Sequence, residues 1–190
     1  MTDAVVIGAG PAGLMAAEVL GQAGFSVIVA EAMPSVGRKF LMAGKSGLNI
    51  TKAEPKGAFL SAYGGAMPVA LKTSLDQFGP DQVIAWAEGL GQPVFSGSTG
   101  RVFPTAMKAS PLLRAWLARL SELGVLIQTR WRWDGWQGEA LAFDTPTGPQ
   151  TTTPKVTVLA TGGASWARLG ANGQWAAHLP GDTTPFQPAN

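Results

Sequence analysis

The sequence has no cysteine and only one histidine, His178, in its 190 residues. Without thiols the chain cannot form disulfides, thiolate metal sites, a thiol nucleophile or a dithiol redox pair. One histidine cannot build a histidine metal site, so we expect no bound metal. We expect His178 itself to be a partly solvated helix residue. Any chemistry of this protein must therefore come from other groups.

Charge and long apolar runs are also scarce. Lys and Arg number 14 and Asp and Glu 12, which gives a net charge of +2. This balance gives little reason to expect nucleic acid or a membrane as a partner. No apolar run approaches the roughly 20 residues of a transmembrane helix, and no basic leader of a signal peptide precedes the first apolar run. We expect a cytoplasmic protein, and one domain fits this length.

The stretch from residue 4 to residue 31 predicts a strand–turn–helix–strand unit that holds a dinucleotide. Ala4–Ile7 is apolar, as a strand buried in a parallel sheet would be. Gly8, Gly10 and Gly13 follow with the spacing G-x-G-x-x-G. In this motif the first glycine permits the tight turn, the second lets the backbone approach a pyrophosphate, and the third lets helix and strand pack closely.

The helix after this turn begins at Pro11 and Ala12 and would offer its unpaired amides to the phosphate. A second apolar strand, 26–30, then leads to Glu31, at about the spacing of a ribose-binding acid. A carboxylate there accepts hydrogen bonds from ribose hydroxyls and repels a 2′-phosphate, which argues against NADP. The alternatives are an ordinary glycine-rich turn and a solvated acid at a strand end. Because strand, glycine turn, helix, second strand and acid are all present, the sequence favours a dinucleotide site over both alternatives.

Basic residues follow the acid. Arg38 and Lys39 are either a solvated basic turn or ligands of phosphate or ribose oxygens. Helices with breaks are predicted from residue 55 to residue 90, with Leu71, Leu75 and Phe78 as one apolar stripe. A short hairpin is predicted over 94–103, and a helix with Ser110 as its N-cap precedes a further parallel strand over 125–129.

Arginine alternates with tryptophan at residues 131–133, a pattern that would suit base stacking on nucleic acid. Strand alternation favours a β-meander instead, with the tryptophans on one face and the arginines toward water. The meander leads to an apolar strand, 155–160, and a second glycine turn at Thr161, Gly162 and Gly163. Ligands of open α/β sheets bind at such carboxyl ends of strands.

These segments together resemble FAD proteins of the two-dinucleotide-binding-domain, glutathione-reductase-like architecture. They are most similar to bacterial NAD(P)/FAD-dependent, aminoacetone-oxidase-like flavoproteins, through residues 37–42, a glycine-rich turn ending at Asn49, residues 100–104 and the turn at 160–165. The family often has arginine and cysteine before that asparagine, where this chain has Gly47 and Leu48. The resemblance implies that Asn49 and the second glycine turn contact FAD and that Trp133 lies at the adenine.

The resemblance implies an α/β, Rossmann-like FAD-binding domain over 1–190, with a parallel sheet, a helical excursion at about 52–92 and a β-meander layer at about 130–154. Family members continue into a substrate domain and a C-terminal FAD segment, so we expect a chain truncated at its C-terminus and inactive alone.

The function implied is an FAD-dependent oxidoreductase. It would transfer hydride between a small organic molecule and FAD, with NAD(P)H or oxygen as second substrate. The alternatives are a non-catalytic FAD-binding fragment that needs a missing half, an NAD-dependent dehydrogenase, and a flavoprotein acting on tRNA, which the modest charge does not support. The sequence predicts neither catalytic residues nor an oligomeric state.

Overall fold

The computed structural model describes residues 2–64 and 67–187, and the chain divides into two compact units. Unit 1 takes Met1–Phe40 and Ala118–Asn190, and unit 2 takes Leu41–Leu117.

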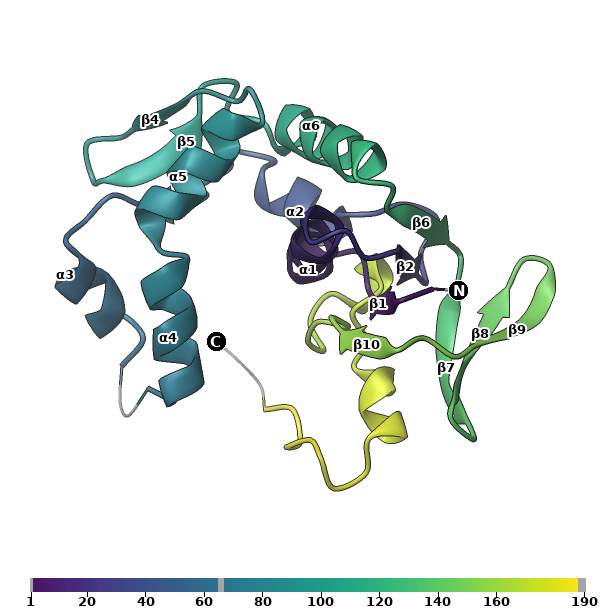
Figure 1. Cartoon of the computed structure of the whole chain (residues 1–190). Helices are drawn as coiled ribbons and strands as arrows, with labels where there is room; N and C mark the ends of the chain where they lie inside the picture. Colours follow the sequence, from purple (N-terminus) through teal and green to yellow (C-terminus); the bar gives the residue numbers. More distant parts are fainter. Residues whose placement is uncertain (1, 65–66, 188–190) are drawn as a thin grey trace. The chain divides into compact units, whose positions relative to one another are not determined.

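Unit 1 is built on a parallel sheet with the strand order β10-β1-β2-β6 (Figure 1). The strands are β1 (Ala4–Ile7), β2 (Val27–Glu31), β6 (Leu126–Thr129) and β10 (Val156–Leu159). All three pairings are parallel, with Ala4 opposite Val27 on one side and Val156 on the other. The chain runs outward from β1 through β2 to β6 and then returns to the far side of β1. The order of the strands therefore reverses between β1 and β10. The predicted Rossmann-like sheet is confirmed.

Helix α1 (Pro11–Gln22) packs on this sheet. The side chain or backbone of Gly13, Leu14, Ala17, Glu18 and Gly21 is buried along it. Small residues at 13, 17 and 21 recur every four positions, so one face of the helix can lie close to the strands. The helix ends just before Gly24, which has a φ of +83°, a left-handed conformation that glycine adopts without strain.

The meander predicted between residues 130 and 154 forms the antiparallel sheet β7–β8–β9: β7 (Arg132–Gln137), β8 (Ala140–Thr145) and β9 (Gly148–Thr152). Its inner face joins the core of the parallel sheet. The members of that buried cluster are Val5, Ile7, Ala30, Trp133, Leu141 and Phe143. Because strand side chains alternate, Val6 points to the opposite face of β1.

The predicted alternation on β7 holds for its first residues. Trp133 is buried, whereas Arg132 is exposed and pairs with Asp144 at 2.8 Å. Beyond a register shift between Trp133 and Trp136, Trp136 lies opposite Leu141, and its ring meets that of Trp133 edge to face with 4.7 Å between the centroids, although Trp136 is 43% exposed. A bulge of this kind adds a residue to one strand, so the side chains beyond it change faces.

Unit 2 holds the antiparallel sheet β3–β5–β4: β3 (Thr51–Lys52), β4 (Val94–Ser96) and β5 (Arg101–Pro104). The hairpin predicted over 94–103 corresponds to β4 and β5. Three helices lie between β3 and β4 in the sequence: α3 (Lys56–Ser61), α4 (Val69–Gln77) and α5 (Pro80–Gly89).

The helix α4 forms where the apolar stripe predicted one, but the stripe is not a buried face. Leu71 and Phe78 are exposed, Leu75 is half-buried, and α4 has no buried residue. The start of the next predicted helix needs correction. Helix α6 (Ala109–Glu122) begins at Ala109 and so includes Ser110, the predicted N-cap.

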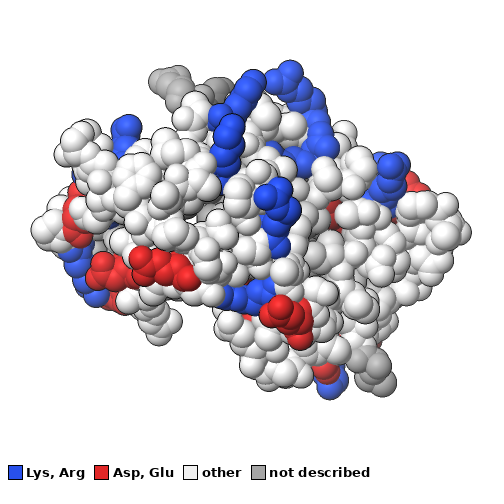
Figure 2. Space-filling view, turned by 90° about the horizontal axis from the view of Figure 1, so that it is seen from above, with Lys and Arg blue, Asp and Glu red and all other residues white. Residues whose placement is uncertain are grey.

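On the face in Figure 2, blue and red side chains are both scattered among uncharged residues. Within residues 2–64 and 67–187, no helix has the length and apolar character to span a membrane.

Candidate functional site

A cavity of about 720 Å³ lies in unit 1 at the carboxyl ends of β1, β2 and β10. Its walls include Ile7 and Leu159, the last residues of β1 and β10, and Glu31, the last residue of β2. Since the strand order reverses between β1 and β10, the cavity opens where doubly wound sheets bind their ligands. Short helix α2 (Arg38–Ala43), strand β7 and the segment 167–178 complete the walls.

The three glycines of the first turn meet different surroundings. Gly8 has a φ of +105°, and a Cβ there would lie 2.4 Å from the carbonyl oxygen of Ala160. A Cβ on Gly13 would lie 1.9 Å from the carbonyl oxygen of Gly8. Gly10 has open space where its Cβ would be, and it lines the cavity with Pro11 and Ala12. Gly8 and Gly13 thus permit close packing of the backbone, and Gly10 leaves the backbone accessible from the cavity.

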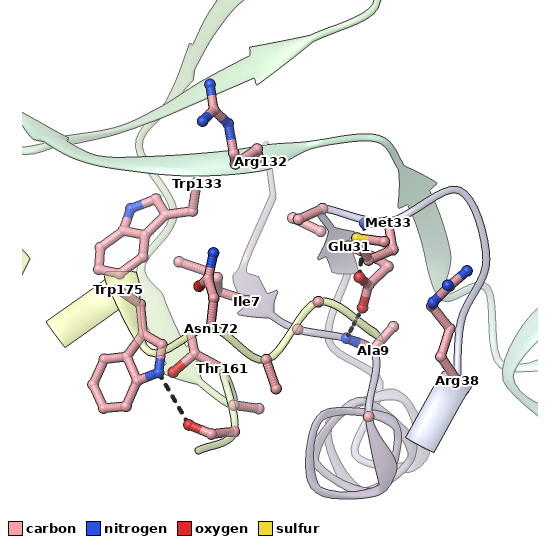
Figure 3. A pocket seen from close by; sticks show the side chains of 18 of the residues that line it. Ile7, Ala9, Glu31, Met33, Arg38, Arg132, Trp133, Thr161, Asn172 and Trp175 are labelled. Carbon is pink, nitrogen blue, oxygen red and sulfur yellow. Dashed lines mark hydrogen bonds between the residues drawn. The ribbon is translucent and has the colours of Figure 1, made fainter. Parts of the chain in front are cut away.

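Glu31 joins the first turn to the tip of β2. Its Oε2 accepts a hydrogen bond from the N–H of Ala9 at 2.9 Å, and its Oε1 accepts one from the N–H of Met33 at 2.8 Å (Figure 3). Each carboxylate oxygen has more than one lone pair, so both can still accept from a ligand hydroxyl. The carboxylate is held in place before any ligand arrives.

Arg38 and Lys39 both line the cavity. The Nη1 and Nη2 atoms of Arg38 contact the hydroxyl of Ser35 at 3.3 Å and the carbonyl of Arg168 at 3.5 Å. Its Nε is buried and, among the described residues, has no hydrogen-bond partner. The two contacts of Nη1 and Nη2 are made with neutral groups and are long. A cation in this position favours an anion beside it.

The second glycine turn follows β10. Thr161 and Gly162 line the cavity, whereas Gly163 is outside its lining. Gly162 has a φ of +76°, and a Cβ there would lie 3.5 Å from Lys39 Nζ. Its carbonyl oxygen accepts a hydrogen bond from the indole N–H of Trp175 at 3.0 Å. This turn, the Lys39 ammonium and the Trp175 indole therefore lie together at one edge of the cavity.

Aromatic residues form another wall. Trp133 is 7% exposed, and its ring lies 5.0 Å from that of His178. The Nε1 of Trp133 is buried and lacks a hydrogen-bond partner among the described residues. In Figure 3 Trp133 and Trp175 lie on one side of the cavity, Glu31 and Arg38 lie on the other, and the Arg132 side chain points away.

Asn49 lies in unit 2 and does not line this cavity. Its side-chain amide donates to the carbonyl of Thr51 at 2.7 Å and to that of Val102 at 3.1 Å. The amide thus ties the start of β3 to β5. Its contact with a cofactor stays a prediction.

The segment 167–178 was missed by the sequence reasoning as part of the site. It contains the 3₁₀ helices η1 (Ala167–Leu169) and η2 (Gln174–His178), and Asn172, Trp175 and His178 face the cavity from it. It has no hydrophobic period, so only its position after a glycine turn at a strand end could have indicated a role. Within the described residues, no cluster of three His, Asp or Glu side chains could hold a metal ion.

Comparison with protein families gives a match over residues 2–181 with the model of the HI0933-like protein Rossmann domain. No curated protein sequence matches the chain.

Several solved structures share the fold. A 3-ketosteroid-delta4-(5alpha)-dehydrogenase from Rhodococcus jostii RHA1 is 16% identical, with a TM-score of 0.64 over 85% of this chain and 46% of that one. An open flavocytochrome c3 fumarate reductase is 22% identical, with a TM-score of 0.57 over 85% and 34%. THI4 from Thermovibrio ammonificans is 18% identical, with a TM-score of 0.54 over 85% and 57%. The chain thus spans 34% to 57% of the length of these three proteins.

Proposed function

The chain belongs to the HI0933-like Rossmann domain family, a family of FAD-binding flavoproteins, and from this premise we propose that it binds FAD as part of an oxidoreductase. The activity proposed is hydride transfer between a small organic molecule and FAD, with NAD(P)H or oxygen as second substrate. The domain that holds the cofactor extends over residues 1–190 in this proposal.

One observation carries the proposal. A single cavity at the β1–β10 reversal brings together the first glycine turn, the Glu31 carboxylate and the Arg38 guanidinium. These groups suit the successive parts of a dinucleotide: amides and a cation for the pyrophosphate, and a carboxylate for the ribose. An ordinary glycine-rich turn would need none of the other groups.

The roles follow from the chemistry of each residue. Gly8, Gly10, Pro11, Ala12 and Gly13 form the pyrophosphate site at the N-terminus of α1, whose first amides have no partner within the helix. Arg38, whose buried Nε has no hydrogen-bond partner in the described part of the chain, adds positive charge to that site. Glu31 accepts from the hydroxyls of the AMP ribose.

The two ends of the cofactor would lie on opposite sides of this centre. The adenine lies at the backbone of Trp133. The redox-active ring lies toward the second glycine turn, Thr161, Gly162 and Gly163, with Lys39 beside it. A simple NAD domain does not need a second glycine turn at its cavity, so the presence of this turn favours FAD over NAD.

When bound, FAD supplies the group that accepts or donates the hydride. This chain binds the cofactor at its phosphate and ribose, orients it along the sheet and excludes water from the part within the cavity. No residue of the cavity is assigned as a general acid or base.

The proposal is tested by adding FAD, NAD or NADP to the purified chain. FAD should raise the melting temperature and acquire a structured, shifted flavin spectrum with altered fluorescence. A rise with NAD and none with FAD would replace the proposal by an NAD-dependent dehydrogenase. FAD binding without reduction by NAD(P)H or by organic donors in an anaerobic screen would fit both a non-catalytic FAD-binding chain and a chain that is inactive alone. Reduction of bound FAD faster than that of free FAD would support the oxidoreductase.

A further inference from the structure

We propose that Trp175 is a positioning residue that fixes the orientation of the second glycine turn for the bound cofactor. The inference rests on the proposed FAD function and names a residue to which the sequence assigned no role. Trp175 lies on η2, 13 positions after Gly162 along the chain, and both residues line the cavity.

The contact is a single, directed hydrogen bond. The indole N–H of Trp175 donates to the carbonyl oxygen of Gly162 at 3.0 Å (Figure 3). An indole N–H is a donor only, so it can select a carbonyl oxygen but not an N–H group. The bond therefore forms only when the carbonyl, and not the N–H, of this peptide group points toward the indole.

That distinction matters because the turn consists of glycines. Gly162 has a φ of +76°, and Gly163 follows it. Glycine adopts left-handed and right-handed conformations with similar ease, so the peptide between them has little intrinsic preference for one orientation. The C=O and N–H of a trans peptide point in opposite directions. By holding the Gly162 carbonyl, Trp175 also sets the direction of the Gly163 N–H.

Trp175 can hold the carbonyl because its own ring is held from several sides. The ring packs against the buried cluster shared by the parallel sheet and the meander. It also meets Phe186 edge to face, with 5.8 Å between ring centroids. One turn further along the same 3₁₀ helix, His178 packs against Trp133. The ring is thus half-buried against the core of unit 1, and its hydrogen bond ties the turn to that core.

The cavity edge that results is electropositive. Lys39 Nζ lies near Gly162, and the carbonyl oxygen of Gly162, the acceptor of that peptide group, accepts the hydrogen bond of the indole. An oriented dipole and a cation at this edge stabilise negative charge on a neighbouring group, and they need no reorganisation when the charge develops. Loss of the indole donor would free the carbonyl to turn toward the ligand, where it would oppose such charge.

Trp175→Phe tests the assignment, because a phenyl ring keeps most of the packing and removes the N–H. We expect the melting temperature of the apoprotein to fall by only about 2–4 °C, the effect of one neutral hydrogen bond. FAD affinity should fall about fivefold, the spectrum of bound flavin should shift, and the flavin reduction potential should be lower. Trp166→Phe is the matched control, since Trp166 lies in the same region, is 54% exposed and is outside the cavity lining. It should match the wild type in all four measurements.

A wild-type affinity, spectrum and potential in Trp175→Phe would overturn the positioning role. A lower melting temperature with a normal flavin spectrum and potential would overturn it too, in favour of packing alone. Failure of the unaltered chain to bind FAD would overturn the proposed function and this inference with it. If Trp175→Phe does not fold, hydrogen exchange at the Trp175 indole N–H of the unaltered chain decides. FAD should slow this exchange at least tenfold, and no change would contradict the role.

Discussion

Glu18 on α1 and Arg119 on α6 form an ion pair in which Nη1 of the arginine lies 2.8 Å from Oε1 of the glutamate. The side chain of Glu18 is 3% exposed and that of Arg119 is 25% exposed. The pair therefore places a charge inside unit 1, where a carboxylate is costly without a cation beside it.

The two halves of this pair should differ in their effect on stability. Arg119→Met leaves the Glu18 carboxylate buried without this cation and should lower the free energy of unfolding by about 3 kcal/mol. Glu18→Gln removes the buried charge itself and should cost less. Urea denaturation of both variants checks the order, and a larger loss in Glu18→Gln would contradict it.

Replacing Glu31 should affect the cofactor more than the fold. Glu31→Ala removes the acceptor of the ribose hydroxyls, and hydrogen bonds to a charged group contribute about 1.5–3 kcal/mol each. FAD affinity should fall at least tenfold in a fluorescence titration. Because the same carboxylate accepts from the N–H groups of Ala9 and Met33, the melting temperature should fall slightly as well.

Glu31→Gln is the control for this experiment. Its amide oxygen can still accept one of the two backbone hydrogen bonds, so it should bind FAD more tightly than Glu31→Ala. An alanine variant that binds FAD as well as the wild type would reduce Glu31 to a structural acceptor for the turn.

Gly10→Ala and Gly13→Ala separate ligand binding from packing. A methyl group at 13 would meet the carbonyl of Gly8 at 1.9 Å, so this variant should be strongly destabilised or fail to fold. A methyl group at 10 has open space and should leave the melting temperature unchanged. It should weaken FAD binding, because it stands where the pyrophosphate approaches the backbone. Equal FAD affinity of Gly10→Ala and wild type would argue against that approach.

Asp3 links stability to acid pH. The hydrogen bond from Lys155, with further ones from Ser26, holds the pKa of Asp3 well below its ordinary value of 3.8. A carboxyl with a lowered pKa in the folded state contributes stability above its unfolded pKa and loses it as pH falls toward the folded one. The free energy of unfolding should therefore decline below about pH 4.

In Asp3→Asn this part of the decline should be missing, and the variant should match the wild type only at the acid end. Denaturation curves at a series of pH values test this expectation. Parallel pH profiles for the two proteins would show that Asp3 does not cause the dependence.

The sequence predicted the parts of unit 1 that depend on local pattern. The strand at Ala4–Ile7, the helix from Pro11 and the strand that ends at Glu31 are consecutive, and each has its own period and turn signal. Their placement in one parallel sheet with residues 126–129 and 156–159 followed from the apolar runs.

Other features depend on tertiary contacts that no local pattern contains. The hydrogen bond from Trp175 to Gly162 exists only because η2 folds back over the second turn. The place of Trp136 opposite Leu141 follows from a register shift between two strands, and Leu71 on α4 is exposed although it is apolar. Sequence spacing predicts that such side chains are apolar, but it cannot predict what they meet.

The position of β1 between β2 and β10 has a consequence for the way the chain folds. Ala4 pairs with Val27, which is close to it in the sequence. Its other partner, Val156, is far along the chain and is synthesised only after most of the protein. Until then one edge of β1 has unpaired backbone groups, which other strands can bind. Contacts so distant in sequence close slowly, and partly folded chains with open edges aggregate. Recovery of this protein after synthesis or dilution from denaturant should therefore depend on the rate at which β10 docks, and it should improve when the chain concentration is low.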